Sequence, residues 1–260
     1  MKMTRKLIPA LVMLLVSAIM LSTASYAWFA SNSEVEANGM KVQVKSDAAF
    51  LEISNTATGG VWKNAASAAN DGTAALKLVT TTIVENTSTA DTFEWKTGEG
   101  SDPTSSALKG ELKTVESEKL AEYVRTDKFY IRMSSGSQTQ LANVKVSSIS
   151  IGTTTIGVNN DLQNALRVLI VGSNGEAQIW SNDDDDGAAD GKLVALGNGD
   201  AAKVICDQVP TSDASAEITV YIYFDGNADE AYTNNATLES IANSLSITIN
   251  FIAESAPAAT

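Results

Sequence analysis

The 260-residue chain contains no histidine and only one cysteine, Cys206. Without histidine, the sequence excludes the His-based catalytic triads and the usual zinc sites that include a histidine ligand. One cysteine cannot form an internal disulfide or a thiolate cluster. We therefore expect a protein that is not an enzyme and that gains its stability from packed secondary structure, not from disulfide bonds.

Basic and aromatic residues are also scarce. Eighteen Lys and Arg stand against 31 Asp and Glu, which gives a net charge of −13. A field of this sign repels nucleic acid and anionic lipid, so we expect no nucleic-acid partner. Aromatic residues make up 6% of the chain, which is few for a glycosidase cleft lined with sugar-stacking rings. The apolar share of 44% lies within the range of globular domains and excludes collagen-like and fully disordered chains.

The N-terminus has the three parts of an export signal. Three basic residues within the first six positions precede an apolar run over residues 7–21, and small polar residues follow it. Ser25 and Ala27 place small side chains at the third and first positions before a cleavage site. The sequence therefore predicts that a signal peptidase cuts after Ala27 and that the mature chain begins at Trp28.

An uncleaved membrane anchor is the alternative to cleavage. Residues 7–30 would just span a bilayer of ~30 Å at ~1.5 Å per residue. Cleavage is favoured because the apolar run is short and residues 22–25 are polar. The C-terminal residues 253–260 carry no sorting signal, so we expect a secreted protein, extracellular or at the cell surface, whose mature form is not embedded in the membrane.

Two-residue alternation of apolar side chains dominates the rest of the chain. Residues 218–224 and 245–251 give the clearest strands, because every second side chain is apolar. Apolar residues change phase between positions 146 and 149, and a bulge near Ser147 and Ser148 would keep both phases inward. The sequence Ser173-Asn174-Gly175 predicts a hairpin turn. Further strands are expected at residues 128–133, 166–170, 177–180, 40–45, 50–53, 75–84, 92–96, 193–196 and 204–207.

The number of strands and turns indicates an all-β fold. We expect an antiparallel β-sandwich resembling a jelly roll, with one short helix at residues 114–123 and one or two turns near residues 237–242. The expected organisation is a signal peptide at 1–27, an extended segment at 28–40 and one β-sandwich domain at 41–260. Loops or insertions are expected at about residues 55–73 and 97–125.

An acidic run at residues 182–187, followed by Asp190, is similar to the first half of a calcium loop. Asp184, Asp186 and Asp190 are the candidate Ca²⁺ ligands, and we expect no other cofactor. A complete EF-hand is excluded, because Leu193 stands where a bidentate Glu is needed. A solvated turn of like charges is the alternative interpretation.

The expected mature N-terminus begins with two large aromatic residues, Trp28 and Phe29. Leaving them in water costs roughly 25 cal/mol per Å² of apolar surface. Together with Val35, Ala37 and Met40 they form a candidate assembly segment. This segment either folds back on its own domain or adds as a strand to the open sheet edge of a neighbouring copy, which would produce a homopolymer.

Two stretches near the N-terminus carry a family resemblance. Residues 21–29, LSTASYAWF, and residues 35–42, VEANGMKV, resemble the leader and first strand of secreted proteins with a SipW-type signal peptide, relatives of the TasA/camelysin group of Gram-positive biofilm-matrix proteins. The resemblance covers about the first 45 residues. It implies a dedicated signal peptidase, a jelly-roll domain and extracellular fibres built by donation of the N-terminal strand. The peptidase activity ascribed to camelysin is not carried over, because this chain has no histidine.

Two functional hypotheses remain open. The favoured one is an exported structural or adhesive protein of the cell surface or biofilm matrix that polymerises with itself. The alternative is a secreted carbohydrate-binding module or a carboxylate-dependent hydrolase with Ca²⁺. In the alternative, Trp62, Trp95 and Trp180 would line a groove, although a buried or half-buried position in the core is favoured for each.

Overall fold

β-strands dominate the computed structural model of the chain. The structure describes residues 13, 34–36, 41–46, 50–68, 75–86, 88–98, 101–102, 105–108, 112–135, 137, 140–153, 165–181, 192–196, 201–228 and 245–256. The expected all-β class is confirmed at this level. No helix within these residues has the length and apolar character needed to cross a membrane.

One half of the main sheet is a run of antiparallel strands. In spatial order it contains β3 (Leu51–Ser54), β11 (Arg125–Met133), β17 (Ala216–Phe224), β13 (Leu166–Val171) and β14 (Ala177–Ser181). The alternation predicted at residues 218–224 is confirmed, because Ile218, Val220 and Ile222 are fully buried. The predicted hairpin at Ser173–Gly175 is also confirmed, since it joins β13 to β14.

The other half continues the sheet and contains one parallel pair. Its strands are β15 (Lys192–Ala195), β12 (Gln140–Thr153), β18 (Leu245–Ala256), β2 (Lys41–Ser46) and β4 (Ala65–Ser67), with β16 (Val204–Gln208) also paired to β12. β18 runs parallel to β2, so the expectation of a purely antiparallel fold was wrong. Parallel neighbours need a long crossover, and here the strands between β2 and β18 in the chain supply it.

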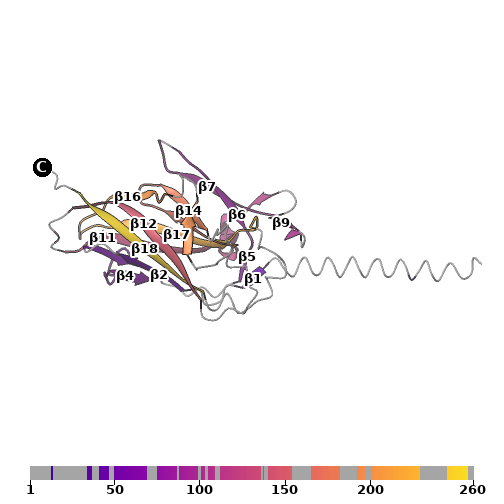
Figure 1. Cartoon of the computed structure of the whole chain (residues 1–260), viewed down its shortest axis with the longest axis horizontal. Helices are drawn as coiled ribbons and strands as arrows, with labels where there is room; N and C mark the ends of the chain where they lie inside the picture. Colours follow the sequence, from indigo (N-terminus) through magenta and orange to yellow (C-terminus); the bar gives the residue numbers. More distant parts are fainter. Residues whose placement is uncertain are drawn as a thin grey trace, which may run out of the picture.

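The two halves of the main sheet meet at two places, and β12, β18 and β2 of the second half lie side by side in Figure 1. At one junction β15 pairs with both β14 and β12, which links the two halves. At the other, Lys63 precedes β4 and exchanges both backbone hydrogen bonds with Ile53 of β3, at 2.7 and 3.2 Å. The sheet is therefore nearly closed.

β12 contains the predicted bulge. Val146 pairs with Phe251 and Ser148 pairs with Asn250, which leaves Ser147 as the extra residue. Because of this insertion, Val144 and Val146 on one side of the bulge and Ile149 and Ile151 on the other are all buried. A second irregularity lies at Asn143, whose φ of 52° falls in the left-handed region that asparagine tolerates.

The inward faces of the two halves enclose one apolar core. Phe129 and Ile131 of β11 and Ile222 of β17 belong to the same cluster as Ile149 of β12 and Phe251 of β18. Cys206 is buried in this core, and burial raises the pKa of its thiol. The cysteine therefore packs as a small apolar side chain and is not a reactive thiolate.

A small outer sheet covers part of the main sheet. It consists of β6 (Thr80–Val84), β7 (Thr92–Thr97) and β10 (Lys113–Thr114). Trp95 of β7 packs edge-on against Tyr223 of β17, with ring centroids 4.9 Å apart, and forms a second apolar cluster with Leu169 of β13. The strand predicted at 75–84 divides into β5 (Ala75–Lys77) and β6, and β5 pairs with β1 (Glu34–Glu36).

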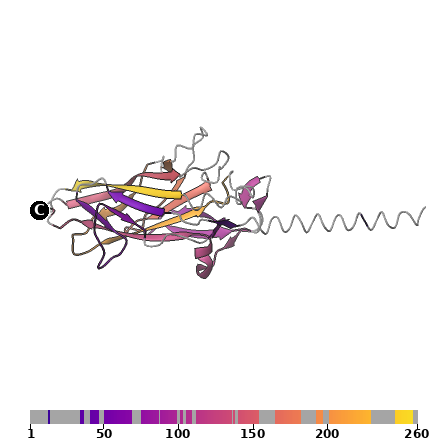
Figure 2. The ribbon, with the colours of Figure 1, turned by 90° about the horizontal axis from the view of Figure 1, so that it is seen from below.

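The expected helix at 114–123 is shorter than predicted. The structure has a 3₁₀ helix, η1 (Ser117–Glu122), which lies on the side of the molecule opposite β18 (Figure 2). Thr114 pairs with Lys96 and belongs to β10, so strand pairing takes the residues that would have started the helix. The segment expected as an insertion also contains β8 (Ser101–Asp102) and β9 (Ser105–Leu108).

Candidate functional site

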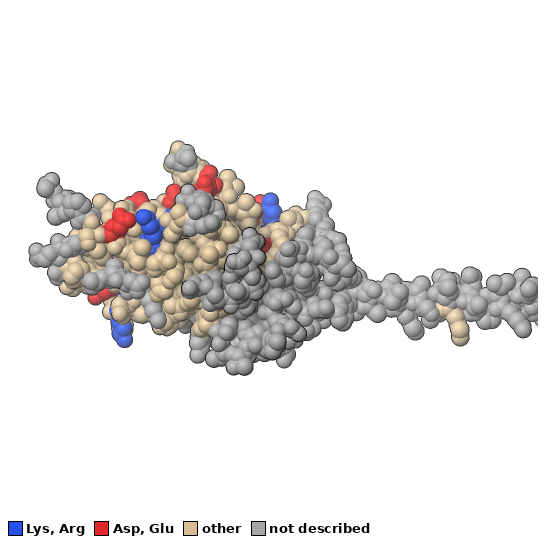
Figure 3. All heavy atoms as spheres, viewed as in Figure 1, with Lys and Arg blue, Asp and Glu red and all other residues tan. Residues whose placement is uncertain are grey.

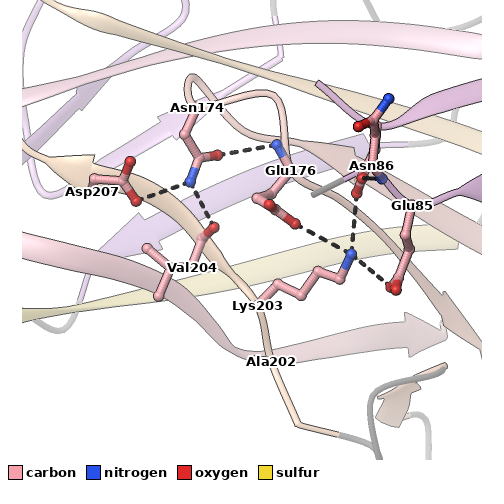
Figure 4. Close-up of a pocket in the computed structure, with 9 residues that line it drawn as sticks. Glu85, Asn86, Asn174, Glu176, Ala202, Lys203, Val204 and Asp207 are labelled. Carbon is pink, nitrogen blue, oxygen red and sulfur yellow. Dashed lines mark hydrogen bonds and ion pairs between the residues drawn. The ribbon is translucent and has the colours of Figure 1, made fainter. Parts of the chain in front are cut away.

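A pocket of about 450 Å³ lies where the outer sheet meets the main sheet. Three chain segments form it: the β6–β7 connection, the β13–β14 turn and the segment that leads into β16. Its wall consists of Glu85, Asn86, Asp91, Asn174, Glu176, Ala202, Lys203, Val204 and Asp207 (Figure 4). Four acidic side chains and one lysine line this pocket. By contrast, most of the described surface on the face drawn in Figure 3 is uncharged.

The ammonium group of Lys203 is the centre of the pocket. Its Nζ lies 2.8 Å from Glu85 Oε1, 3.1 Å from Asp91 Oδ2 and 3.3 Å from Glu176 Oε2. Burial by itself lowers the pKa of Lys203, but the hydrogen bonds to the three carboxylates raise it far above its ordinary value. Lys203 therefore keeps its proton and is unsuited to act as a nucleophile or a general base.

Asp91 is the most deeply buried acid of this cluster, with a side chain only 1% exposed. Its carboxylate accepts hydrogen bonds from the N–H groups of Asn86 at 3.0 Å and Ala177 at 2.9 Å, in addition to Lys203. Burial raises the pKa of Asp91, but these hydrogen bonds and the Lys203 charge together hold it below its ordinary value. The ionised carboxylate thus links the β6–β7 connection to β14.

The backbone of the β13–β14 turn fits closely against the β6–β7 connection. Gly175 has a φ of 86°, and its carbonyl accepts a hydrogen bond from Asp91 N–H at 3.0 Å. A Cβ atom at Gly175 would lie 2.6 Å from Ala90 Cβ. Only glycine therefore fits both the left-handed backbone and the close approach of the two loops.

Two amide side chains attach the segment before β16 to the same place. Asn174 Nδ2 donates to the carbonyl of Val204 at 2.9 Å and to Asp207 Oδ1 at 3.1 Å. Gln178 Nε2 donates to the carbonyl of Ala201 at 2.9 Å, and Gln178 Oε1 accepts from Lys203 N–H at 2.9 Å. Hydrogen bonds and ion pairs therefore connect each of the three chain segments of the pocket to another.

This geometry is better suited to holding the three chain segments together than to catalysing a reaction. One ammonium group occupies the position between the carboxylates that a cation would take, and across the described ranges no three metal-binding side chains converge on an ion site. Sequence patterns did not reveal the cluster, because its members come from distant segments and carry no common motif. We refer to Lys203, Glu85, Asp91 and Glu176 as the lysine clamp.

The sites predicted from the sequence fall mostly elsewhere. Val35 lies in β1, where its backbone pairs with Leu76 of β5. The residues outside the described part of the chain are the proposed Ca²⁺ ligands Asp184, Asp186 and Asp190, the cleavage residues Ala27 and Trp28, and the assembly residues Phe29, Ala37 and Met40.

The three tryptophans weighed as groove residues differ in environment. Trp95 is 7% exposed and Trp180 is 5% exposed, so both pack in apolar clusters. Trp62 is half-buried, and the guanidinium carbon of Arg132 lies 4.1 Å from its ring centroid. Of the three, Trp62 alone keeps substantial surface available to a ligand.

Comparisons of the chain with protein-family models, with curated proteins and with solved structures found no match.

Proposed function

We propose that the protein is an exported structural or adhesive subunit of the cell surface or extracellular matrix, whose copies join by exchange of the N-terminal strand. One observation carries this proposal. β1, only a few residues beyond the expected cleavage site at Ala27, is paired to its own chain through three residues of β5 and, among the described strands, has no partner in the main sheet.

The β1–β5 ladder is well suited to exchange between copies. Glu34 pairs with Lys77, Val35 with Leu76 and Glu36 with Ala75. Each backbone hydrogen bond contributes only about 1 kcal/mol net, and the same bonds form again when the strand of another copy takes the place of β1. Because the exchange conserves the ladder, it costs little, and the aromatic residues that precede β1 add apolar surface that favours a protected site.

The architecture and the leader support the same proposal. Two sheet halves that enclose one core fit a β-sandwich of the jelly-roll kind, as the resemblance to the TasA/camelysin group implies. In this account a SipW-type signal peptidase removes residues 1–27 and the mature chain leaves the membrane. An assembly without disulfides also fits a chain whose only cysteine is buried.

A reversible lock on the β1–β5 ladder tests the proposal. Directly opposite Cα atoms in antiparallel strands lie about 4.5 to 5.5 Å apart, which permits a disulfide. The double variant Glu36→Cys/Ala75→Cys should form an internal disulfide that holds β1 on its own chain. Negative-stain microscopy of the mature protein should then find filaments for the wild type, none for the oxidised variant, and filaments again after reduction.

The single variants serve as matched controls and as an independent test. Copies with only Glu36→Cys mixed with copies with only Ala75→Cys should yield disulfide-linked heterodimers, whereas either alone should not form this cross-link. Cys206 does not compete, because it is buried. A mature wild-type protein that stays monomeric at high concentration, or filaments that persist in the oxidised double variant, would contradict the proposal.

A further inference from the structure

A strip of outward-facing side chains runs along β11, beside the area that the outer sheet covers. Lys128, Tyr130 and Arg132 alternate with the buried residues Phe129 and Ile131. From Lys128 to Arg132 the strip extends about 13 Å, at ~3.3 Å per residue. It is long enough to contact more than one unit of an extended ligand.

Trp62 and Arg132 form the rigid end of this strip. Arg132 Nε and Nη2 both donate to Glu52 Oε2 at 3.1 Å, and Arg132 Nη1 donates to the carbonyl of Ser212 at 2.9 Å. The fixed guanidinium group lies 4.1 Å from the centroid of the Trp62 ring. The half-buried indole is therefore held in one orientation before any ligand arrives.

The next row along β11 is polar, and its side chains contact one another. Tyr130 Oη donates to Glu217 Oε2 at 3.0 Å, and Lys128 Nζ lies 2.7 Å from Glu217 Oε1. The strip thus holds two cations, Arg132 and Lys128, and two anions, Glu52 and Glu217, in direct pairs. It is locally neutral on a chain whose net charge is −13.

We propose that this strip binds a neutral polysaccharide. A sugar ring presents an apolar C–H face that stacks on the exposed part of Trp62, as aromatic rings at binding sites accept flat apolar surfaces. Its hydroxyl groups both donate and accept, so they match the carboxylates of Glu52 and Glu217 and the hydroxyl oxygen of Tyr130 as acceptors, and the remaining N–H groups of Arg132 as donors. Because the local charges cancel, the strip offers no net attraction to a polyanion or a polycation. This binding is distinct from strand exchange and would attach the protein to a glycan surface.

Affinity electrophoresis of the mature chain tests this inference. The native gels contain laminarin, hydroxyethyl cellulose or yeast mannan as neutral probes and alginate as the charged comparison. All of these gels use the oxidised Glu36→Cys/Ala75→Cys variant, so that fibre formation does not affect mobility. Glycan binding can then be measured whether or not the strand-exchange proposal holds. We expect at least one neutral polysaccharide to retard the protein and alginate to retard it less.

Variants of the strip identify the binding site. Trp62→Ala should weaken binding about tenfold, Trp62→Phe should weaken it less, and Tyr130→Phe should weaken it by loss of one hydroxyl. Val194→Ala, on β15 in the other half of the sheet, is the matched control and should bind as the parent does. Thermal melts followed by circular dichroism verify that each variant is folded. If Trp62→Ala is unfolded, the binding of Trp62→Phe and Tyr130→Phe tests the inference instead. No retardation by any neutral probe, stronger retardation by alginate, or full binding by these variants would overturn the inference.

Discussion

The ammonium group of Lys203 lies 3.1 Å from the buried carboxylate of Asp91, although 112 positions separate the two residues in the chain. This pair joins the outer sheet to the main sheet. Asp91 belongs to the β6–β7 connection, and Lys203 belongs to the segment that Gln178 holds against β14. The attachment of the outer sheet therefore depends on a charged group as well as on the apolar cluster around Trp95.

Replacement of Asp91 tests the strength of the lysine clamp. Asp91→Asn should lower the free energy of unfolding by about 2 kcal/mol, because an amide cannot accept all three hydrogen bonds and leaves Lys203 partly unpaired. Glu85→Gln is the matched control, since the Glu85 side chain is 67% exposed and exposed ion pairs contribute at most about 1 kcal/mol. Urea unfolding measures both, and equal effects of the two variants would contradict a special role for Asp91.

The clamp should also make stability depend on pH. The pKa of Asp91 lies below its ordinary value of 3.8 in the folded chain. Its contribution is therefore complete above about pH 5 and is lost as the pH falls through the folded-state pKa. The pKa of Lys203 is raised, so its contribution persists at all lower pH values and is lost only in strongly basic solution. Urea midpoints of the wild type and Asp91→Asn should converge on acidification, and a gap that stays constant down to about pH 3 would refute this assignment.

Gly59 and Gly175 both have a positive φ. Comparing their alanine variants distinguishes the cost of backbone strain from the cost of a steric clash. Gly59→Ala should cost about 1 kcal/mol, because its φ is 69° but no atom lies within 4 Å of an added Cβ. Gly175→Ala should cost about 3 kcal/mol, since its φ is 86° and the added Cβ would also meet Ala90. Thermal unfolding compares the two variants. Similar losses of stability in both variants would indicate that the β6–β7 connection moves aside for the added methyl group at no cost in free energy.

The hydroxyl group of Ser181 is buried and has no hydrogen-bond partner among the described residues. Ser181→Ala should therefore leave stability unchanged or raise it by about 1 kcal/mol, because it removes an unsatisfied polar group. Ser54→Ala is the contrasting variant, since the buried Ser54 Oγ accepts a hydrogen bond from Thr56 N–H at 3.2 Å. Chemical denaturation should find Ser54→Ala less stable than Ser181→Ala, and the reverse order would contradict the structure.

Local sequence patterns predicted the local structure well. The alternation in β17 and β18, the bulge at Ser147 and the turn at Gly175 all depend on residues close together in the chain. Alternation indicates which face of a strand is buried, but it does not identify the neighbouring strand. The parallel pairing of β18 with β2 was missed for this reason.

The lysine clamp and the strip on β11 lay beyond sequence-based prediction for a related reason. Lys203, Glu85 and Glu176 carry no spacing that marks them as partners, and each resembles an ordinary surface charge. Trp62 was recognised as a candidate, but its contact with Arg132 depends on the pairing of β3 with β11. Long-range pairing therefore determined both sites.

The bridge between Lys63 and Ile53 has a consequence for how copies of this chain meet one another. Exposed rows of unpaired backbone groups recruit other chains indiscriminately, and the bridge pairs part of the β3 edge with the segment that leads into β4. In the strand exchange that we propose, copies would meet at a small peripheral ladder such as that of β5. A nearly closed main sheet then favours association in one direction over amorphous precipitation.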